Sequence, residues 1–336
     1  MNAPLDRGHA ATTLSYAQAA ATALAACMAA DPRIVVLGED LGRGGVFGQY
    51  LLDGAPLVQR FGRDRIIDTP ISEANILGAA VGMALAGLRP VVEMRVIDFA
   101  LCAMDELVNQ AAKNRFMFGG QSRVPLVVRM PMGIWTASAA QHSQSLEAWF
   151  AHLPGVLVAC PATPQDNHDL LTAALACGEP VVYLEHKELW PLRGEVIATD
   201  SAHPRPFGRA RIVRAGSDLT LVSWSRTVHA ALDAATQLTA QGIAAEVIDL
   251  RTLWPWDRDT VLASAARTGR LFVAHEAVQP AGFGAEIVAV AAQDLGCRVG
   301  RLGAPRIPVG YAPTLEAEAR IDAPKIAAAI THWLHA

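Results

Sequence analysis

The sequence predicts an α/β fold made of two domains, each with a mostly parallel sheet flanked by helices. Short apolar runs rich in β-branched residues alternate with longer stretches rich in alanine and leucine, which is typical of parallel strands connected by helices. The length of 336 residues exceeds what one hydrophobic core usually organises. A polar, proline-rich stretch at 193–207 separates two regions that both show the alternation, which favours a linker between domains.

The first region covers residues 14–192 and follows a predicted N-terminal tail at 1–13. Residues 16–30 predict a helix of small apolar side chains. Two more helices are predicted from their ends: one is capped by Ser72 and closed near Gly87, and the other starts at Asp166 and is closed by Gly178. Strands are predicted at 34–37, 90–92, 126–129, 156–159 and 181–184.

The second region covers residues 208–336 and repeats the same pattern. Strands are predicted at 219–223, 245–249 and 271–274, and helices at 228–241 and 283–295. The region therefore predicts a second α/β domain after the linker.

The composition excludes several classes of function. A net charge of −4 gives no basic field for a nucleic acid or an anionic membrane surface. The longest apolar run, 76–88, is too short to span a bilayer. The five cysteines are scattered without a Cys-x-x-Cys pair, so neither a disulfide framework nor a metal site is indicated. We expect a cytoplasmic protein with neither nucleic acid nor a membrane as its partner.

Familiar catalytic motifs are absent or wrongly spaced. The glycines at 38–48 follow a predicted strand, but their spacing departs from the dinucleotide-binding pattern and no helix opens there. The P-loop, the His-Glu-x-x-His motif and the Gly-x-Ser-x-Gly motif do not occur in the sequence. A nicotinamide oxidoreductase is therefore disfavoured.

Three polar residues stand where α/β proteins place functional groups, although each also has a structural explanation. Glu39 follows a predicted strand, where turns also favour acidic residues. Glu73 opens a predicted helix, whose positive end stabilises a carboxylate. His142 lies in a polar patch before a helix that Ser145 could cap, where it could transfer protons or only satisfy backbone groups.

The segment 67–76, with the sequence IDTPISEANI, resembles the Asp-Thr-Pro-Ile-x-Glu stretch of the β subunits of 2-oxo acid dehydrogenases. Other blocks agree with that family in order and spacing, and the resemblance spans roughly Leu14 to Leu334. These blocks lie at 38–40, 88–93, 109–113, 141–145, 184–187 and 247–253. The segments 117–121 and 141–150 are most similar to acetoin-dehydrogenase and some pyruvate-dehydrogenase β chains, and the substrate stays open.

The resemblance implies a transketolase-like pyrimidine-binding domain followed by a transketolase C-terminal domain. It further implies a heterotetramer of two α and two β subunits that share thiamine diphosphate. The acyl group would pass to lipoyl on a dihydrolipoyl acyltransferase. Because no Gly-Asp-Gly with a downstream asparagine occurs in this sequence, Mg²⁺ and the diphosphate are expected on the α subunit.

In the family, one glutamate protonates the aminopyrimidine ring so that the imino tautomer can remove the thiazolium proton, and Glu73 matches it. This role calls for an apolar setting, buried at the subunit interface, that raises the pKa of the carboxyl group. Ile71 matches a cofactor contact, and Ile76 and Leu77 are expected to complete the apolar setting.

Other matched positions complete the expected site. Glu39 matches an acid that joins a proton path between active sites in some members, and Phe99 matches an aromatic residue beside the pyrimidine. His142 matches the histidine near the substrate, where it could stabilise developing charge or guide acyl transfer.

Two positions depart from the family pattern. Arg95 stands near the cofactor where many relatives carry glutamine, and it could bring an extra charge into the site. Ile134, Trp135 and Thr136 replace a glycine-rich stretch, so a bulkier loop is expected to select a different acyl group. An alternative of another class is a non-catalytic assembly or regulatory subunit, against which the presence of Glu73 and His142 argues.

Overall fold

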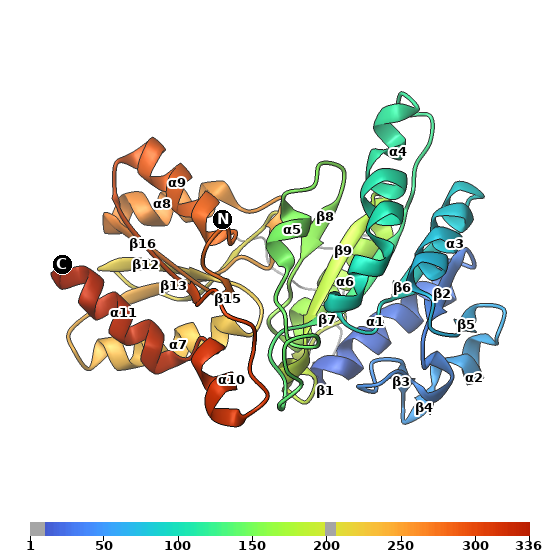
Figure 1. Cartoon of the computed structure of the whole chain (residues 1–336), viewed down its shortest axis with the longest axis horizontal. Coiled ribbons are helices and arrows are strands. Elements are labelled where there is room, and N and C mark those ends of the chain that lie inside the picture. The colour runs from blue at the N-terminus through green and yellow to red at the C-terminus, as the bar shows by residue number, and fades with distance from the viewer. Residues whose placement is uncertain (1–10, 199–205) are drawn as a thin grey trace.

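The computed structural model describes residues 11–198 and 206–336, which form two lobes side by side (Figure 1). The N-terminal lobe is built on a seven-stranded sheet with the order β14-β8-β9-β7-β6-β2-β5. Six of these strands are parallel, and β14 pairs with β8 in the antiparallel direction. In chain order they are β2 (Ile34–Gly38), β5 (Ile66–Asp68), β6 (Arg89–Glu93), β7 (Val127–Met132), β8 (Leu157–Ala159), β9 (Val181–His186) and β14 (Thr252–Trp254).

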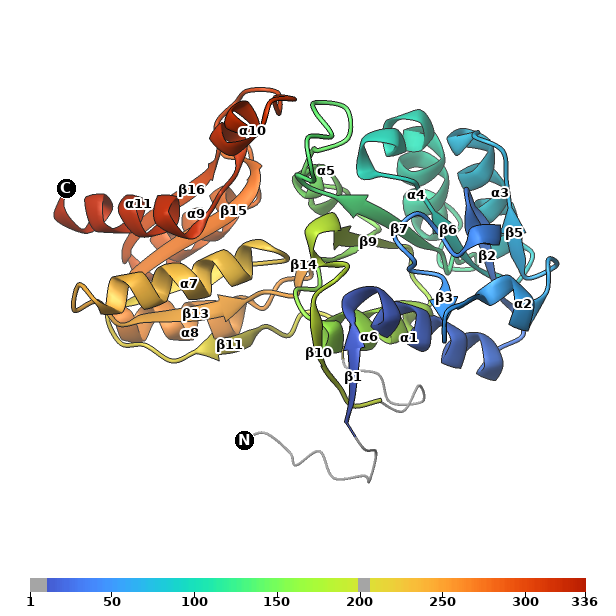
Figure 2. The same ribbon diagram turned by 90° about the horizontal axis from the view of Figure 1, so that it is seen from below.

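Helices cover both faces of this sheet (Figure 2). On one face lie α1 (Tyr16–Ala30) and α6 (Pro164–Cys177), whose apolar side chains share a core with Val36, Val91 and Val127. On the other face lie α3 (Glu73–Leu85), η2 (Ile97–Ala103), the π-helical η3 (Glu106–Ala111) and α4 (Ala112–Met117). The helix α5 (Glu147–Ala151) precedes β8. The remaining short elements of this lobe are η1 (Leu41–Arg43), β3 (Leu51–Leu52), β4 (Ala55–Pro56), α2 (Leu57–Phe61) and η4 (Lys187–Leu189).

The C-terminal lobe contains a five-stranded sheet with the order β11-β13-β12-β15-β16. Its strands are β11 (Arg211–Arg214), β12 (Leu219–Ser223), β13 (Ala245–Asp249), β15 (Arg270–Val278) and β16 (Arg298–Ala304), and only β11 is antiparallel to its neighbour. The pairs α7 (Thr227–Thr239) with α11 (Ala323–His335), and α8 (Arg258–Thr268) with α9 (Gly284–Leu295), cover opposite faces (Figure 1). The short α10 (Pro313–Ala319) lies beside the junction of the lobes.

Several local predictions are corrected by the structure. The strands β1 (Thr12–Ser15) and β10 (Arg193–Val196) pair with each other, although their residues were assigned partly to a tail and to a linker. The helix α6 starts at Pro164, where Thr163 accepts the Asp166 N–H at 3.1 Å, so Asp166 is not its first residue. The helix α3 starts at Glu73 as expected, but Ser72 accepts from the Asn75 side chain and caps no backbone N–H.

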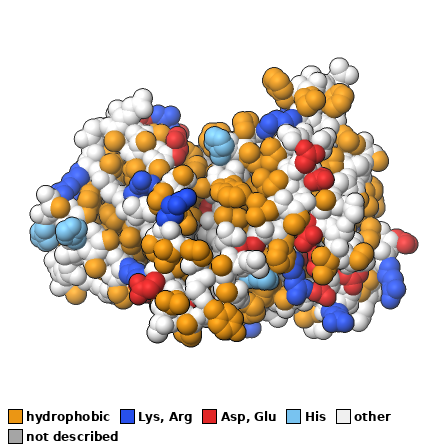
Figure 3. Space-filling view, in the orientation of Figure 1, with side chains coloured by type: hydrophobic (Ala, Val, Ile, Leu, Met, Phe, Trp, Pro, Cys, Tyr) orange, Lys and Arg blue, Asp and Glu red, His pale blue; other side chains and the backbone are white. Residues whose placement is uncertain are grey.

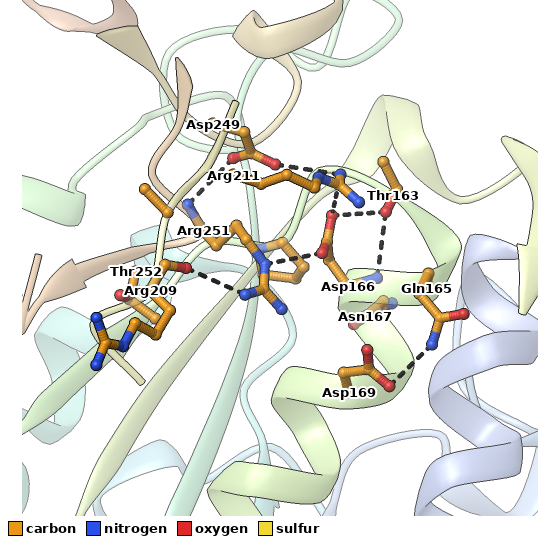
Figure 4. A network of polar contacts seen from close by, with 12 residues as sticks. Thr163, Gln165, Asp166, Asn167, Asp169, Arg209, Arg211, Asp249, Arg251 and Thr252 are labelled. Carbon is orange, nitrogen blue, oxygen red and sulfur yellow. Dashed lines mark hydrogen bonds and ion pairs between the residues drawn. The ribbon is translucent and has the colours of Figure 1, made fainter. Parts of the chain in front are cut away.

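A buried ion network joins the two lobes (Figure 4). Asp166, on α6, accepts hydrogen bonds from Arg251 and Arg211 of the C-terminal lobe, both at 2.8 Å. Arg211 also lies 3.6 Å from Asp249. Separating the lobes would leave the buried Asp166 carboxylate without its partners, which costs free energy. These contacts therefore hold the lobes in a fixed relative position. Among the described residues, no helix is long and apolar enough to cross a membrane.

Candidate active site

The carboxyl ends of the parallel strands in the N-terminal lobe surround a half-open hollow of about 650 Å³. Open α/β sheets bind ligands at this edge, because the loops that follow neighbouring strands converge there. The polar and aromatic residues that line the hollow include Glu39, Asp40, Arg95, Phe99, His142 and Lys187. Together with residues 68–71, the hollow gathers side chains from the loops after five strands, β2, β5, β6, β7 and β9.

Most of the residues predicted from the sequence meet here. Glu39, Ile71, Arg95, Phe99 and His142 all line the hollow. Glu73 is not among its lining residues, but it starts α3 directly after the lining segment 69–71. The structure thus places Glu73 at the border of the hollow.

Two carboxyl groups lie close together at this border. Burial raises the pKa of Glu39 above its ordinary value, the neighbouring Glu73 carboxylate raises it further, and Arg95 acts in the opposite direction. Like charges in one site disfavour double ionisation. Burial and this neighbour therefore make Glu39 hold its proton more readily than an ordinary glutamate.

The surroundings of Glu73 within the single chain are partly apolar and partly open. Ile76 and Leu77 follow Glu73 by three and four positions on α3, and both are buried in the core. Ile71 is 78% exposed. Glu73 itself is half-buried. The expected setting is buried at a subunit interface, so for the single chain it stays a prediction.

The extra charge expected from Arg95 is neutralised by a neighbour. Its guanidinium group forms an ion pair with Asp40, which follows β2 with a φ of 59°. Both side chains are partly exposed, so the pair is oriented toward the hollow without being sealed in the core. The site therefore carries a paired charge at this position.

His142 is exposed, and its ring stands edge-on to the Phe99 ring with 5.2 Å between the ring centres. The Lys187 ammonium group donates to the carbonyl oxygen of His142. Burial lowers the pKa of Lys187 to about 8, even though Asp98 and other nearby carboxylates favour its charged form. A flat aromatic face, an imidazole and a cation thus converge on one side of the hollow.

The loop before His142 is bulky, as the sequence indicated. Trp135 lines the hollow and packs edge-on against Phe47 at 5.0 Å, and Phe47 stacks on Trp190 at 5.5 Å. Sequence reasoning missed Phe47 and Lys187. Lys187 could have been found from its place directly after a buried strand, whereas nothing local marks Phe47.

The residues present suit one end of a heteroaromatic cofactor. Phe99 and the segment 69–71 offer surfaces for a flat ring, and Glu39 and Glu73 offer carboxyl groups for its nitrogens. Within 11–198 and 206–336, no group of three or more histidines, cysteines or acids is arranged to hold a metal ion.

Comparison with known proteins identifies both lobes. The chain matches the family "Transketolase, pyrimidine binding domain" over residues 12–193 and "Transketolase, C-terminal domain" over residues 208–326. The β subunit of acetoin:2,6-dichlorophenolindophenol oxidoreductase from Cupriavidus necator is 43% identical over 90% of this chain and 92% of its own length. The β subunit of 2-oxoisovalerate dehydrogenase from Bacillus subtilis is 38% identical over 95% of this chain and 98% of its own length.

Two further comparisons agree. The mitochondrial pyruvate dehydrogenase E1 component subunit beta-2 from Oryza sativa subsp. japonica is 40% identical over 91% of this chain and 82% of the relative. A solved structure described as a split gene transketolase, inactive beta4 tetramer, covers 98% of this chain and 99% of its own with a TM-score of 0.77. At 22% identity, that structure shows the fold alone.

Proposed function

Because this chain belongs to the β subunits of thiamine-diphosphate-dependent 2-oxo acid and acetoin dehydrogenases, we propose that it supplies the pyrimidine-binding half of an active site completed by an α subunit. The observation that carries the proposal is the meeting of Glu39, Phe99 and His142 in one hollow, with Glu73 at its border. These groups come from separate loops of a matched pyrimidine-binding domain.

Thiamine diphosphate, when bound, supplies an acidic thiazolium carbon that becomes the nucleophile for a substrate carbonyl. In the proposed site, Glu73 holds a proton at the pyrimidine nitrogen para to the amine. Burial and the neighbouring Glu73 carboxylate raise the pKa of Glu39, and this supports a role for Glu39 in exchanging that proton. Phe99 orients the ring through its face.

His142 takes the substrate side of the site in this proposal. An imidazole can donate a hydrogen bond to developing negative charge and can guide the acyl group to the lipoyl acceptor. Its exposure leaves it accessible to an incoming lipoyl arm. The bulky Trp135 wall is the feature by which the site would select among 2-oxo acids or acetoin.

Exposed apolar side chains support partner contacts. Large ones gather at the tip of α4, where Phe116 is 89% exposed beside Met117 and Phe118 (Figure 3). Ile71 projects similarly beside the hollow. Such patches mark protein contact surfaces. We assign these exposed residues of α4 and Ile71 to subunit contacts in a tetramer of two α and two β subunits. In this proposal the α subunit holds Mg²⁺ and the diphosphate. A dihydrolipoyl acyltransferase receives the acyl group.

Subunit mixing tests this function. The chain is purified alone and together with its α subunit, and thiamine diphosphate binding with Mg²⁺ is measured by calorimetry. Turnover of pyruvate, 2-oxoisovalerate and acetoin is followed with an artificial electron acceptor. We expect tight binding and turnover only for the pair. A chain that binds the cofactor tightly alone, or a correctly assembled pair that is inert with all three substrates, would contradict the proposal.

A further inference from the structure

The loop that carries His142 has an unusual backbone. It runs from the end of β7 to α5, and three of its non-glycine residues have positive φ: Thr136 at 41°, Ala137 at 54° and Ala139 at 61°. Such conformations cost free energy and persist only where surrounding groups hold them. Two acidic side chains of the C-terminal lobe contact the ends and the middle of this loop.

Glu276, on β15 of the C-terminal lobe, ties the two ends of the loop together. Its Oε1 accepts the Ile134 N–H at 2.9 Å and the Ser145 hydroxyl at 3.2 Å. The sequence suggested that Ser145 could cap α5, but the N-cap residue is Leu146 and no side chain caps this helix. Burial would raise the pKa of Glu276, but His186 and the Ile134 N–H outweigh it and lower this pKa to about 2. The carboxylate is thus a permanent acceptor.

Glu316 contacts the middle of the loop, where the strain lies. This residue of α10 is 8% exposed, and its Oε2 accepts the Ala137 N–H at 2.7 Å. In both ribbon views the loop between β7 and α5 lies beside α10 (Figures 1 and 2). The backbone group that Glu316 holds belongs to a positive-φ residue.

A chain of charges orients Glu316. Its Oε1 accepts from Arg320 at 3.1 Å, and Arg320 donates to Glu188 at 2.6 Å. Glu188 also pairs with Arg226 at 3.0 Å. Because Glu188 belongs to the N-terminal lobe and the other residues to the C-terminal lobe, this chain spans the junction. It ends at the Ala137 N–H.

We propose that Glu316 is a positioning residue: by accepting the Ala137 N–H, it imposes the strained shape of residues 136–139 and so sets His142 against Phe99. The C-terminal lobe thereby acts on the active site of the other lobe without touching substrate. The proposal rests on the proposed function for the role of His142. The contact between Glu316 and the loop stands independently of that role.

The test compares variants in the assembled pair with the α subunit. For Glu316→Ala we expect hydrogen exchange in the peptide covering 133–146 to become about tenfold faster or more, because the Ala137 N–H loses its acceptor. We expect kcat to fall about 10- to 100-fold from misplacement of His142, with cofactor affinity unchanged. Glu318→Ala, at an exposed position of the same helix, is the matched control and should change neither quantity.

Two further variants separate positioning from general stability. Glu316→Gln keeps an oxygen acceptor for Ala137 while removing the charge that faces Arg320, so it should retain most of the loop protection and kcat. Ala137→Gly, added to Glu316→Ala, should recover part of kcat, because glycine adopts positive φ without the steric cost.

Unchanged loop exchange in Glu316→Ala would overturn the proposal. Equal damage from Glu316→Gln and Glu316→Ala would also overturn it, since the ion pair with Arg320 would then be the contact that matters. The exchange measurement decides the loop contact even in a pair that turns over none of the three substrates. A failure of the proposed function is therefore visible separately.

Discussion

At the scale of single residues, Lys187 shows how burial alters a side chain at the site. It is 2% exposed, and its ammonium group donates to the carbonyl oxygen of His142. Burial lowers its pKa to about 8. An ordinary lysine in the unfolded chain titrates near 10.5. Folding therefore favours the neutral form of Lys187 in the pH range between these two values.

This difference predicts a pH-dependent stability. Between pH 8 and 10.5 the unfolded chain binds more protons at Lys187 than the folded chain, so the free energy of unfolding rises with pH across this window. The contribution is about 3 kcal/mol at most. Lys187→Met should remove this rise, as measured by urea unfolding at pH 8 and pH 10. Lys113→Met serves as the control, and a rise that is equal in wild type and Lys187→Met would refute the assignment.

The candidate site could be predicted only in part at this scale. Glu39 follows a predicted strand and lies in a family block, Phe99 matches a family position, and Arg95 marks a departure from the family pattern; all three line the hollow. Phe47 lies in a glycine-rich stretch and reaches the hollow only through the fold. Asp40 forms an ion pair with Arg95 and has a left-handed backbone conformation. No local sequence pattern predicted this conformation or the pair.

At the scale of elements, β-branched runs located the inner strands well, because strands buried on both faces are apolar along their whole length. The edge elements were missed. Thus β10 (Arg193–Val196) has only one buried residue and gains its partner β1 from 180 positions away. Mostly polar helices such as α8 (Arg258–Thr268) lack the apolar content that was used to find the others.

The junction between β7 and the His142 loop gives a prediction at this scale. Gly133 has a φ of 88°, and a Cβ there would lie 2.1 Å from Nε2 of His186 and 2.7 Å from Oε1 of Glu276. Gly133→Ala should lower the free energy of unfolding by about 2–5 kcal/mol. It should also speed exchange in the loop, because Glu276 is displaced.

Gly119→Ala is the matched control for Gly133→Ala. Gly119 has a φ of 58° with nothing within 4 Å of an added Cβ. Its substitution isolates the backbone cost, about 1 kcal/mol. Equal losses in urea unfolding for the two variants would show that the close approach at Gly133 is unimportant.

At the scale of the whole molecule, two α/β units were predictable from the repeated alternation, but their connection was not. The strand β14 (Thr252–Trp254) comes from the second half of the sequence and completes the sheet of the first lobe beside β8. Asp166 pairs with Arg251 across the same junction. Both contacts join residues far apart in sequence, and local patterns carry no information about such pairs.

Within the single chain, the site around Glu73 is only partly enclosed. Glu73 is half-buried within the single chain, and Ile71 beside it is 78% exposed. The apolar enclosure that raises the pKa of a carboxyl group would then come from the covering α subunit. We therefore expect Glu73 to act only in the assembled pair.

The role of Glu73 is tested most directly by the rate at which the thiazolium C2 hydrogen of bound thiamine diphosphate exchanges with D₂O. This rate is measured by quenched-flow NMR on the assembled pair. Glu73→Gln keeps the size of the side chain but replaces the carboxyl group that holds the proton by an amide. We expect exchange to slow by about 100-fold or more, with assembly unchanged in sedimentation. Exchange at the wild-type rate in a fully assembled Glu73→Gln pair would contradict this role.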